Sequence, residues 1–164
     1  MKIPCFAAIT LVCSFFFLAG CQTMPFSAQN GTVSSEDRVS ISEGKQSGSW
    51  RGKDLTVDYA GTRTGADLEL NGTVRFAAHM LMGFSLLRDF HLSAILTDEN
   101  GKVLETKGIT ADRGQIGPIP FRVRFSVPAG AASMAFTYSG VAVEGGGDDG
   151  GGGFTHFWQY PVKH

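Results

Sequence analysis

The feature that most constrains this chain is a strict alternation of apolar and polar residues, seen most clearly over residues 119–127. There Ile, Phe and Val occupy alternate positions, while Arg122, Arg124 and Ser126 lie between them. A period of two is the side-chain period of a β-strand, so this segment predicts a strand with one apolar and one polar face. Similar segments recur from residue 53 onward. Because each has only one apolar face, we expect antiparallel sheets packed together rather than a parallel sheet.

Residues 68–76 predict one continuous strand, although Asn71-Gly72 is a dipeptide typical of two-residue hairpin turns. A turn there would place Leu68 opposite Arg75 and mix apolar and polar side chains on one face. A continuous strand keeps the two faces separate. We therefore expect Gly72 to mark a bulge or a close approach of another part of the backbone.

A hairpin is predicted at residues 98–101, Asp-Glu-Asn-Gly. With a three-residue loop, Thr97 faces Val103 and Leu96 faces Leu104. Gly101 supplies the left-handed residue that such a loop requires.

Together the alternating segments predict an all-β fold of about seven strands over residues 50–164. Short strands separated by turn residues are typical of a single antiparallel immunoglobulin-like β-sandwich, which is the fold that we expect. Residues 77–87 are apolar without a period of two, and a short helix, a crossover loop and a strand extension all fit them. Gly140 is expected to allow a change of phase before Val141 and Val143.

The first twenty residues have the layout of a signal peptide. Lys2 gives a positive start, and residues 5–18 are almost unbroken apolar sequence, too short to span a bilayer comfortably. The run ends in Leu18-Ala19-Gly20-Cys21, which resembles the lipobox of bacterial lipoproteins. The resemblance implies cleavage between Gly20 and Cys21, attachment of diacylglycerol to the Cys21 thiol, and often a further acyl chain on the new amine. Several acyl chains on one residue would anchor the protein stably at a membrane.

The expected organisation is a signal peptide at residues 1–20, a lipidated N-terminus with a flexible tether at residues 21–49, and the β-sandwich at residues 50–164. The tether is expected because residues 22–49 are rich in Ser, Gly, Gln and Thr and have no sustained periodicity. By resemblance to enterobacterial lipoproteins, Gln22 rather than Asp after the lipidated cysteine favours the outer membrane. The strand and hairpin pattern also resembles envelope lipoproteins with immunoglobulin-like folds and no assigned activity.

Composition argues against several classes of function. The 14 basic and 15 acidic residues give a formal net charge of −1 and form no basic tract, so nucleic acid is not an expected partner. The chain has no Gly-x-Ser-x-Gly, His-Glu-x-x-His or phosphate-loop motif. The histidines are scattered, at His79, His91, His156 and His164. We expect no catalytic site and no cofactor; a small hydrolase whose Ser, His and Asp meet only in the folded chain is one alternative.

His79, Met80 and Met82 form the most pointed local cluster. An imidazole with two thioethers is a soft ligand set suited to Cu(I), so a periplasmic copper-handling lipoprotein is a second alternative. Methionine also fills irregular gaps in a core, and this is the role that we expect for Met80 and Met82.

Residues 145–153 contain seven glycines around Asp148-Asp149. Two adjacent carboxylates suit Ca²⁺, but the spaced oxygen ligands of calcium loops are missing, and we expect a mobile solvated loop. An aromatic run follows, consisting of Phe154, His156, Phe157, Trp158 and Tyr160. We expect it to be mainly core, because a sandwich without disulfides needs large buried rings; an exposed aromatic edge that binds a partner is the alternative.

The leading expectation is a membrane-anchored bacterial envelope lipoprotein with a non-enzymatic binding or structural domain. Its expected partners are the membrane, through the lipid on Cys21, and an envelope protein or other envelope component.

Overall fold

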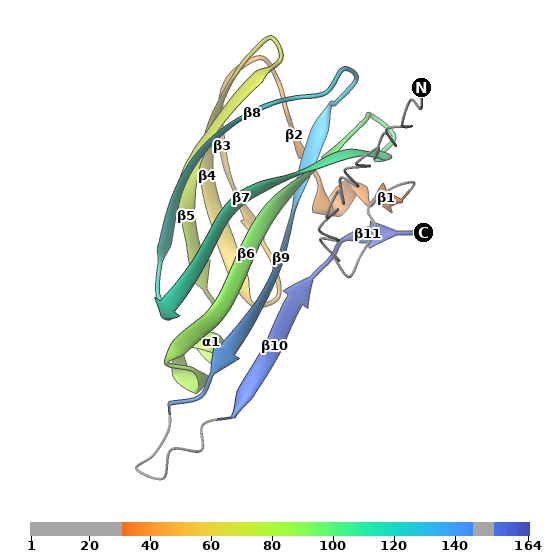
Figure 1. The fold of residues 1–164 in the computed structure, drawn as a ribbon. Helices are drawn as coiled ribbons and strands as arrows, with labels where there is room; N and C mark the ends of the chain where they lie inside the picture. Colours follow the sequence, from red (N-terminus) through yellow and green to blue (C-terminus); the bar gives the residue numbers. More distant parts are fainter. Residues whose placement is uncertain (1–30, 146–152) are drawn as a thin grey trace, which may run out of the picture.

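Two antiparallel sheets contain most of the chain in the computed structural model, which describes residues 31–145 and 153–164 (Figure 1). The first sheet, in the order β3-β4-β5-β8, consists of β3 (Gly44–Arg51), β4 (Leu55–Thr64), β5 (Asp67–Phe76) and β8 (Ile119–Ser126). The second sheet, in the order β10-β9-β6-β7, consists of β10 (Phe154–Gln159), β9 (Ser133–Val143), β6 (Leu86–Thr97) and β7 (Val103–Gln115), with β2 (Val39–Ser40) also paired to β9. A small third sheet joins β1 (Thr32–Val33) to β11 (Val162–Lys163). The helical segments are η1 (Ser35–Asp37) and α1 (Ala78–Gly83).

The first and second sheets enclose one apolar core, which confirms the expected all-β class. Phe136 of β9 packs against Trp50 of β3 and Tyr59 of β4, each with ring centroids 5.6 Å apart. Phe76 of β5 lies 5.4 Å from Phe90 of β6. Burying one such side chain stabilises a fold by roughly 1.5–3 kcal/mol, so these rings between the sheets are a main source of stability. Within the described residues, no helix combines the length and apolarity needed to cross a membrane.

The phase predicted for β8 is confirmed. Phe121 is buried in the core, while Arg122 and Arg124 face outward. Arg122 pairs with Glu69, and the Arg124 guanidinium lies 2.8 Å from an Asp67 carboxylate oxygen. The outer face of the first sheet is therefore a solvated surface of cross-strand ion pairs.

The continuous strand predicted across Asn71-Gly72 is also confirmed, because β5 pairs with β4 along its whole length. A Cβ atom on Gly72 would lie 2.1 Å from the Asp58 carbonyl oxygen and 2.7 Å from Phe121 Cζ. Gly72 thus marks a close approach of the β4 backbone to β5, which is one of the two alternatives expected for this glycine.

The hairpin between β6 and β7 has the predicted turn but a shifted register. Gly101 has a φ of 85°, and Thr97 pairs with Val103 as expected. Leu96 pairs with Glu105 instead of Leu104, since a bulge lies between Leu96 and Thr97. The predicted partner of Leu96 was therefore wrong by one residue, because the bulge inserts Leu104 as an extra residue on β7.

The flexible tether predicted for residues 21–49 is wrong where the structure describes it. Residues 31–49 contain β1, β2 and most of β3, and β3 pairs with β4 over its full length. The sequence of β3 lacks the apolar–polar alternation of a strand, because polar Gln46 and Gly48 occupy positions on the same side as the buried Trp50. A Cβ on Gly48 would lie 2.7 Å from the Tyr59 hydroxyl, so a larger side chain would not fit there. The described domain begins near Thr32 instead of residue 50. Its described residues form eleven strands instead of about seven, because β1, β2, β3 and β11 were not expected.

Residues 77–87 combine two of the three conformations considered: the short helix α1 at Ala78–Gly83, and at residues 86–87 the start of β6. Helix α1 connects β5 in the first sheet to β6 in the second, and its Met80 is buried in the core. The expected phase change at Gly140 is wrong: Tyr138 and Ala142 are both buried, while Val141 and Val143 lie on the opposite face.

A second, smaller apolar cluster lies outside the main core. Val33 of β1 and Val162 of β11 are buried with Ile95 and Ala135, two residues on the outer face of the second sheet. The β1–β11 pair therefore covers one end of that outer face, and Figure 1 shows it beside the end of β10.

Candidate functional site

Strand β10 carries exposed aromatic side chains. Phe157 points inward, where its ring stacks with Phe90 at a centroid distance of 6.2 Å. Alternation along the strand places Phe154, His156 and Trp158 on the opposite face, and Phe154 and Trp158 are 61% and 56% exposed. The expectation that this run is mainly core is therefore wrong, because only Phe157 has the inward phase.

The neighbouring strands add apolar side chains to the same face. Phe154 pairs with Val143 of β9, and Val143 pairs in turn with Leu86 of β6, which is 48% exposed. His156 pairs with Val141 of β9. We call the outward side chains of this region the aromatic surface; they are Phe154, His156, Trp158, Val141, Val143 and Leu86.

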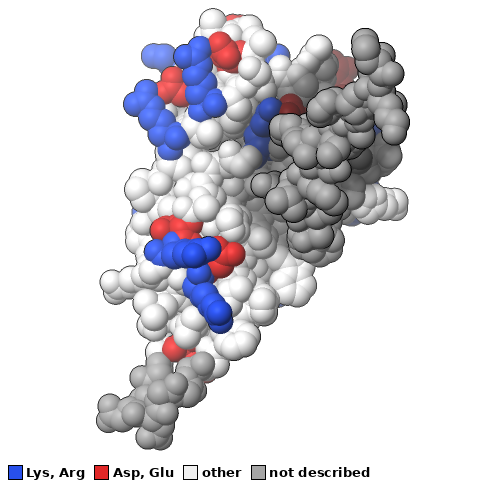
Figure 2. Space-filling model, viewed as in Figure 1, with Lys and Arg blue, Asp and Glu red and all other residues white. Residues whose placement is uncertain are grey.

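Charged groups border the aromatic surface but do not enter it. On β6, the Asp89 carboxylate lies 3.1 Å from His91 Nε2 and 3.7 Å from Arg113 Nε. In Figure 2 the charged side chains gather in small mixed clusters, and most of the visible surface is uncharged. An exposed cluster of large apolar side chains with a polar border is typical of an interaction site.

The β9–β10 connection adjoins the aromatic surface. Glu144 donates its backbone N–H to the Gly153 carbonyl oxygen at 2.9 Å, which closes the base of the connection. Residues 146–152, with Asp148 and Asp149, lie outside the described residues, as do Leu18, Ala19, Gly20 and Cys21. The expectations of a mobile loop and of lipidation stay predictions.

The candidate copper ligands do not converge. Met80 is 2% exposed and packed in the core, whereas Met82 is 82% exposed. His79 Nε2 lies 3.2 Å from Asp54 Oδ1. The helix thus directs its two thioethers into different environments. Among the described residues, no group of three or more His, Cys, Asp or Glu side chains is arranged to hold a metal ion.

The contact between His79 and Asp54 belongs to a polar cluster that no sequence pattern indicated, with Asp54 buried and His79 half-exposed. The Tyr138 hydroxyl donates to Asp54 Oδ2 at 2.9 Å, and the Asp54 backbone N–H donates to the same hydroxyl oxygen at 3.1 Å. Burial raises the pKa of Tyr138 well above its usual range, so the hydroxyl remains a donor even at alkaline pH values where a free tyrosine loses its proton. Gln159 Oε1 accepts from the Lys53 backbone N–H at 2.8 Å. The cluster ties the β3–β4 turn, α1, β9 and β10 together at one end of the sheets.

A hydrolase triad is not assembled by the described residues. His79 and His91 each contact a carboxylate, but neither is hydrogen-bonded to a serine within the part of the chain that the structure describes. His156 and His164 are exposed at the C-terminal end. The serine that a Ser-His-Asp relay needs is thus missing from both His–Asp pairs.

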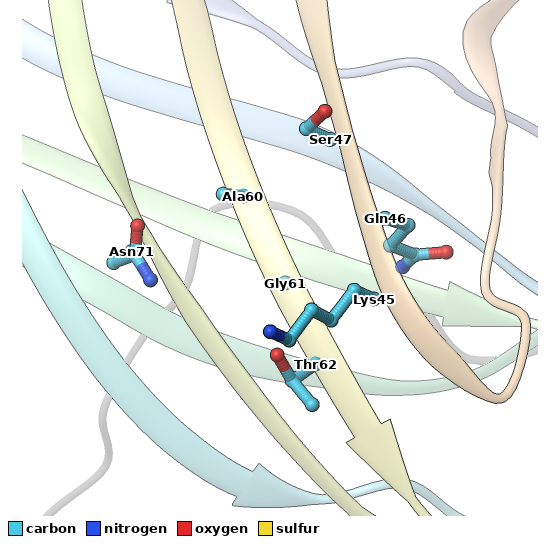
Figure 3. Close-up of a pocket in the computed structure, with 7 residues that line it drawn as sticks. All are labelled: Lys45, Gln46, Ser47, Ala60, Gly61, Thr62 and Asn71. Carbon is cyan, nitrogen blue, oxygen red and sulfur yellow. The ribbon is translucent and has the colours of Figure 1, made fainter.

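The outer face of the first sheet has a shallow depression, shown in Figure 3. Its lining residues come from β3, β4 and β5 and are Lys45, Gln46, Ser47, Ala60, Gly61, Thr62 and Asn71. Small Ala60 leaves the space, and Lys45 is the single charged group in the lining. A lining without histidine or carboxylate offers no acid–base pair, so the depression is a weaker candidate than the aromatic surface.

Comparison with known protein families, with curated proteins and with solved structures found no match to this chain.

Proposed function

We propose that this chain is a lipid-anchored bacterial envelope protein whose domain is non-enzymatic and binds another envelope protein through the aromatic surface. The observation that carries the proposal is the exposure of Phe154 and Trp158 on one face of β10. Large aromatic side chains lose little conformational entropy on binding and bury much area, so they commonly dominate protein–protein interfaces.

The anchoring part of the proposal is supported by Leu18-Ala19-Gly20-Cys21, and Gln22 favours the outer membrane facing the periplasm. Replacement of the thiol tests it directly. Cys21→Ser should abolish fatty-acid labelling and leave an unprocessed or soluble protein. Persistent labelling of that variant would contradict anchoring at Cys21.

For the domain, we also propose an immunoglobulin-like arrangement of the two sheets. The order β10-β9-β6-β7 supports it, since strands G, F, C and C′ of variable-type immunoglobulin sheets follow one another in the same way. The neighbours β5 and β8 would take the places of strands B and E in the other sheet. An experimental structure that links these strands in another order would exclude this classification.

Binding is tested by purification of the full chain from membranes. The double variant Phe154→Ser/Trp158→Ser should lose a co-purifying envelope protein. Leu104→Ser is the matched control, because Leu104 is an exposed apolar residue on β7 at the opposite edge of the same sheet. Retention of all partners by the double variant would exclude the aromatic surface as the binding site.

A further inference from the structure

β10 is the least protected of the four long edge strands. Edge strands usually carry charges, prolines or bulges that prevent pairing with another chain. Pro120, Arg122 and Arg124 lie on β8, Lys45 and Arg51 lie on β3, and β7 has charged residues and several register shifts. By contrast, β10 reads Phe-Thr-His-Phe-Trp-Gln, without a Lys, Arg, Asp, Glu or Pro. Among the described residues it pairs only with β9, and Figure 1 shows it at the side of its sheet.

The free backbone groups of β10 follow from the register. Gly153 accepts a hydrogen bond from Glu144, and the pairing continues with Phe154 opposite Val143. In an antiparallel ladder, hydrogen-bonded and non-hydrogen-bonded pairs alternate. Thr155, Phe157 and Gln159 therefore direct their N–H and C=O groups toward β9. Phe154, His156 and Trp158 direct theirs toward the open edge, so the residues with exposed side chains also have the unpaired backbone.

This arrangement fits a second β10 strand in one particular register. An antiparallel pair centred on His156 places Phe154 opposite the partner's Trp158, and His156 opposite the partner's His156. All three residues then form hydrogen-bonded pairs, each of which exchanges two N–H···O bonds. Two aromatic cross-strand pairs result on the outer face, and such pairs stabilise antiparallel strands. Because β10 carries no Lys, Arg, Asp or Glu, no permanently charged side chains are brought together.

From these observations we propose that β10 is a self-pairing site, through which two copies of the chain join their second sheets into one continuous sheet. The two-fold axis of such a pair is perpendicular to the sheet, so the outer faces of both copies lie on the same side. The β1 strand packs on that outer face through Val33, next to Ile95 and Ala135. The β1 strands of both copies therefore lie on the same side of the joined sheet, an arrangement that suits two chains anchored in one membrane.

The inference rests on the proposed function, because anchoring in one membrane raises the effective concentration of the two strands. The occupant that it names is a second copy of this chain. Sequence and register favour it over an unrelated peptide, since β10 supplies both the free backbone and the matching aromatic side chains.

Cysteine cross-linking of the full chain in intact cells tests the register. Residues 22–164 contain no natural cysteine, so an introduced thiol is the single one in this part of the chain. His156→Cys places two Cα atoms about 5.5 Å apart across the two-fold axis, within the range of a disulfide. Phe154→Cys and Trp158→Cys are out-of-register controls, because four residues of offset separate their equivalent positions by roughly 13 Å.

We expect His156→Cys to form a disulfide-linked dimer under mild oxidation and each control to form at least tenfold less. Adding His156→Glu to the wild-type strand should abolish the dimer measured by chemical cross-linking, because two carboxylates would meet at the axis. Equal cross-linking at all three positions, or none at position 156, would overturn self-pairing. If the His156→Cys protein instead cross-links to a different protein, self-pairing is refuted while the proposed binding function is retained. Fatty-acid labelling at Cys21 is measured on the same cells as a separate readout. If labelling is absent, the anchor has failed; if labelling is present without cross-linking at position 156, the pairing has failed.

Discussion

The ring of Phe157 lies directly over Gly140, the residue with which it pairs across β9 and β10. A Cβ atom on Gly140 would lie 2.5 Å from Phe157 Cζ and 2.8 Å from the Asp89 carbonyl oxygen. The glycine therefore provides the space that allows the single inward aromatic residue of β10 to reach the core.

Gly140→Ala should consequently destabilise the domain by about 1–3 kcal/mol, the usual cost of overpacking a filled core. Gly108→Ala on β7 is the matched control, since no atom lies within 4 Å of its added Cβ, and it should be neutral or slightly stabilising. Denaturant unfolding of the two variants measures both effects. Equal stability would show that Phe157 does not need the space over Gly140.

Trp50→Ala tests whether β3 belongs to the domain. Trp50 is buried against Phe136 and Tyr138, so its truncation should cost about 3–5 kcal/mol. Ser47→Ala on the solvent face of the same strand should leave the free energy of unfolding nearly unchanged. A negligible effect of Trp50→Ala in thermal unfolding would restore the tether interpretation for residues 44–49.

Truncations along β8 should follow the burial of its side chains. Phe121→Ala should cost about 3–5 kcal/mol, because Phe121 is buried between the sheets. Phe125 is only partly buried, so Phe125→Ala should cost less. Arg124→Ala should have little effect, since solvent screens its surface pair with Asp67. Melting temperatures in the reverse order would invalidate the phase of β8.

Tyr138→Phe should weaken the domain by roughly 1–3 kcal/mol at neutral pH, because the buried Asp54 carboxylate loses a hydrogen-bond donor. At alkaline pH the difference should shrink. Tyrosine in the unfolded chain loses its proton near pH 10, whereas burial raises the pKa of Tyr138 in the folded state. The stabilisation linked to this proton is complete below pH 10 and is lost as pH rises through the folded pKa.

The measurement is the free energy of unfolding from pH 8 to pH 11 for wild type and Tyr138→Phe. A flatter decline is expected for the variant, with a residual slope from Tyr59 and Tyr160, whose pKa values are also raised by burial. Parallel curves for the two proteins would show that Tyr138 is not the titrating group.

The success of the sequence-based predictions depended on what occupies the inward positions of each strand. On β8 and β5 these positions hold Phe, Val and Leu, and alternation identified the strands and their phase. On β3 they include Gln46 and Gly48, so a paired strand was mistaken for a tether. Two-residue periodicity detects a strand only where its buried side chains are apolar.

The aromatic surface could be predicted only as one of two alternatives. Alternation separates Phe157 from Phe154 and Trp158, but aromatic residues on both faces do not show which face is buried. That choice depends on Gly140 and on the edge position of β10, which are properties of the assembled sheet. The cluster of Asp54, His79 and Tyr138 was not predicted because its members are distant in sequence.

The pairing of β1 with β11 has a mechanical consequence for a chain held at its N-terminal end. Tension transmitted along the chain enters the described domain at Gly31 and loads β1 first. Two register pairs, Thr32 with Lys163 and Val33 with Val162, join β1 to β11, and one bridge, Thr32 with Lys102, joins it to the β6–β7 turn. By contrast, β4 and β5 share ten register pairs. The terminal pair would yield before either large sheet, lengthen the chain and leave the main core intact. In single-molecule pulling on residue 31, this should produce a small extension at low force that precedes the main unfolding event.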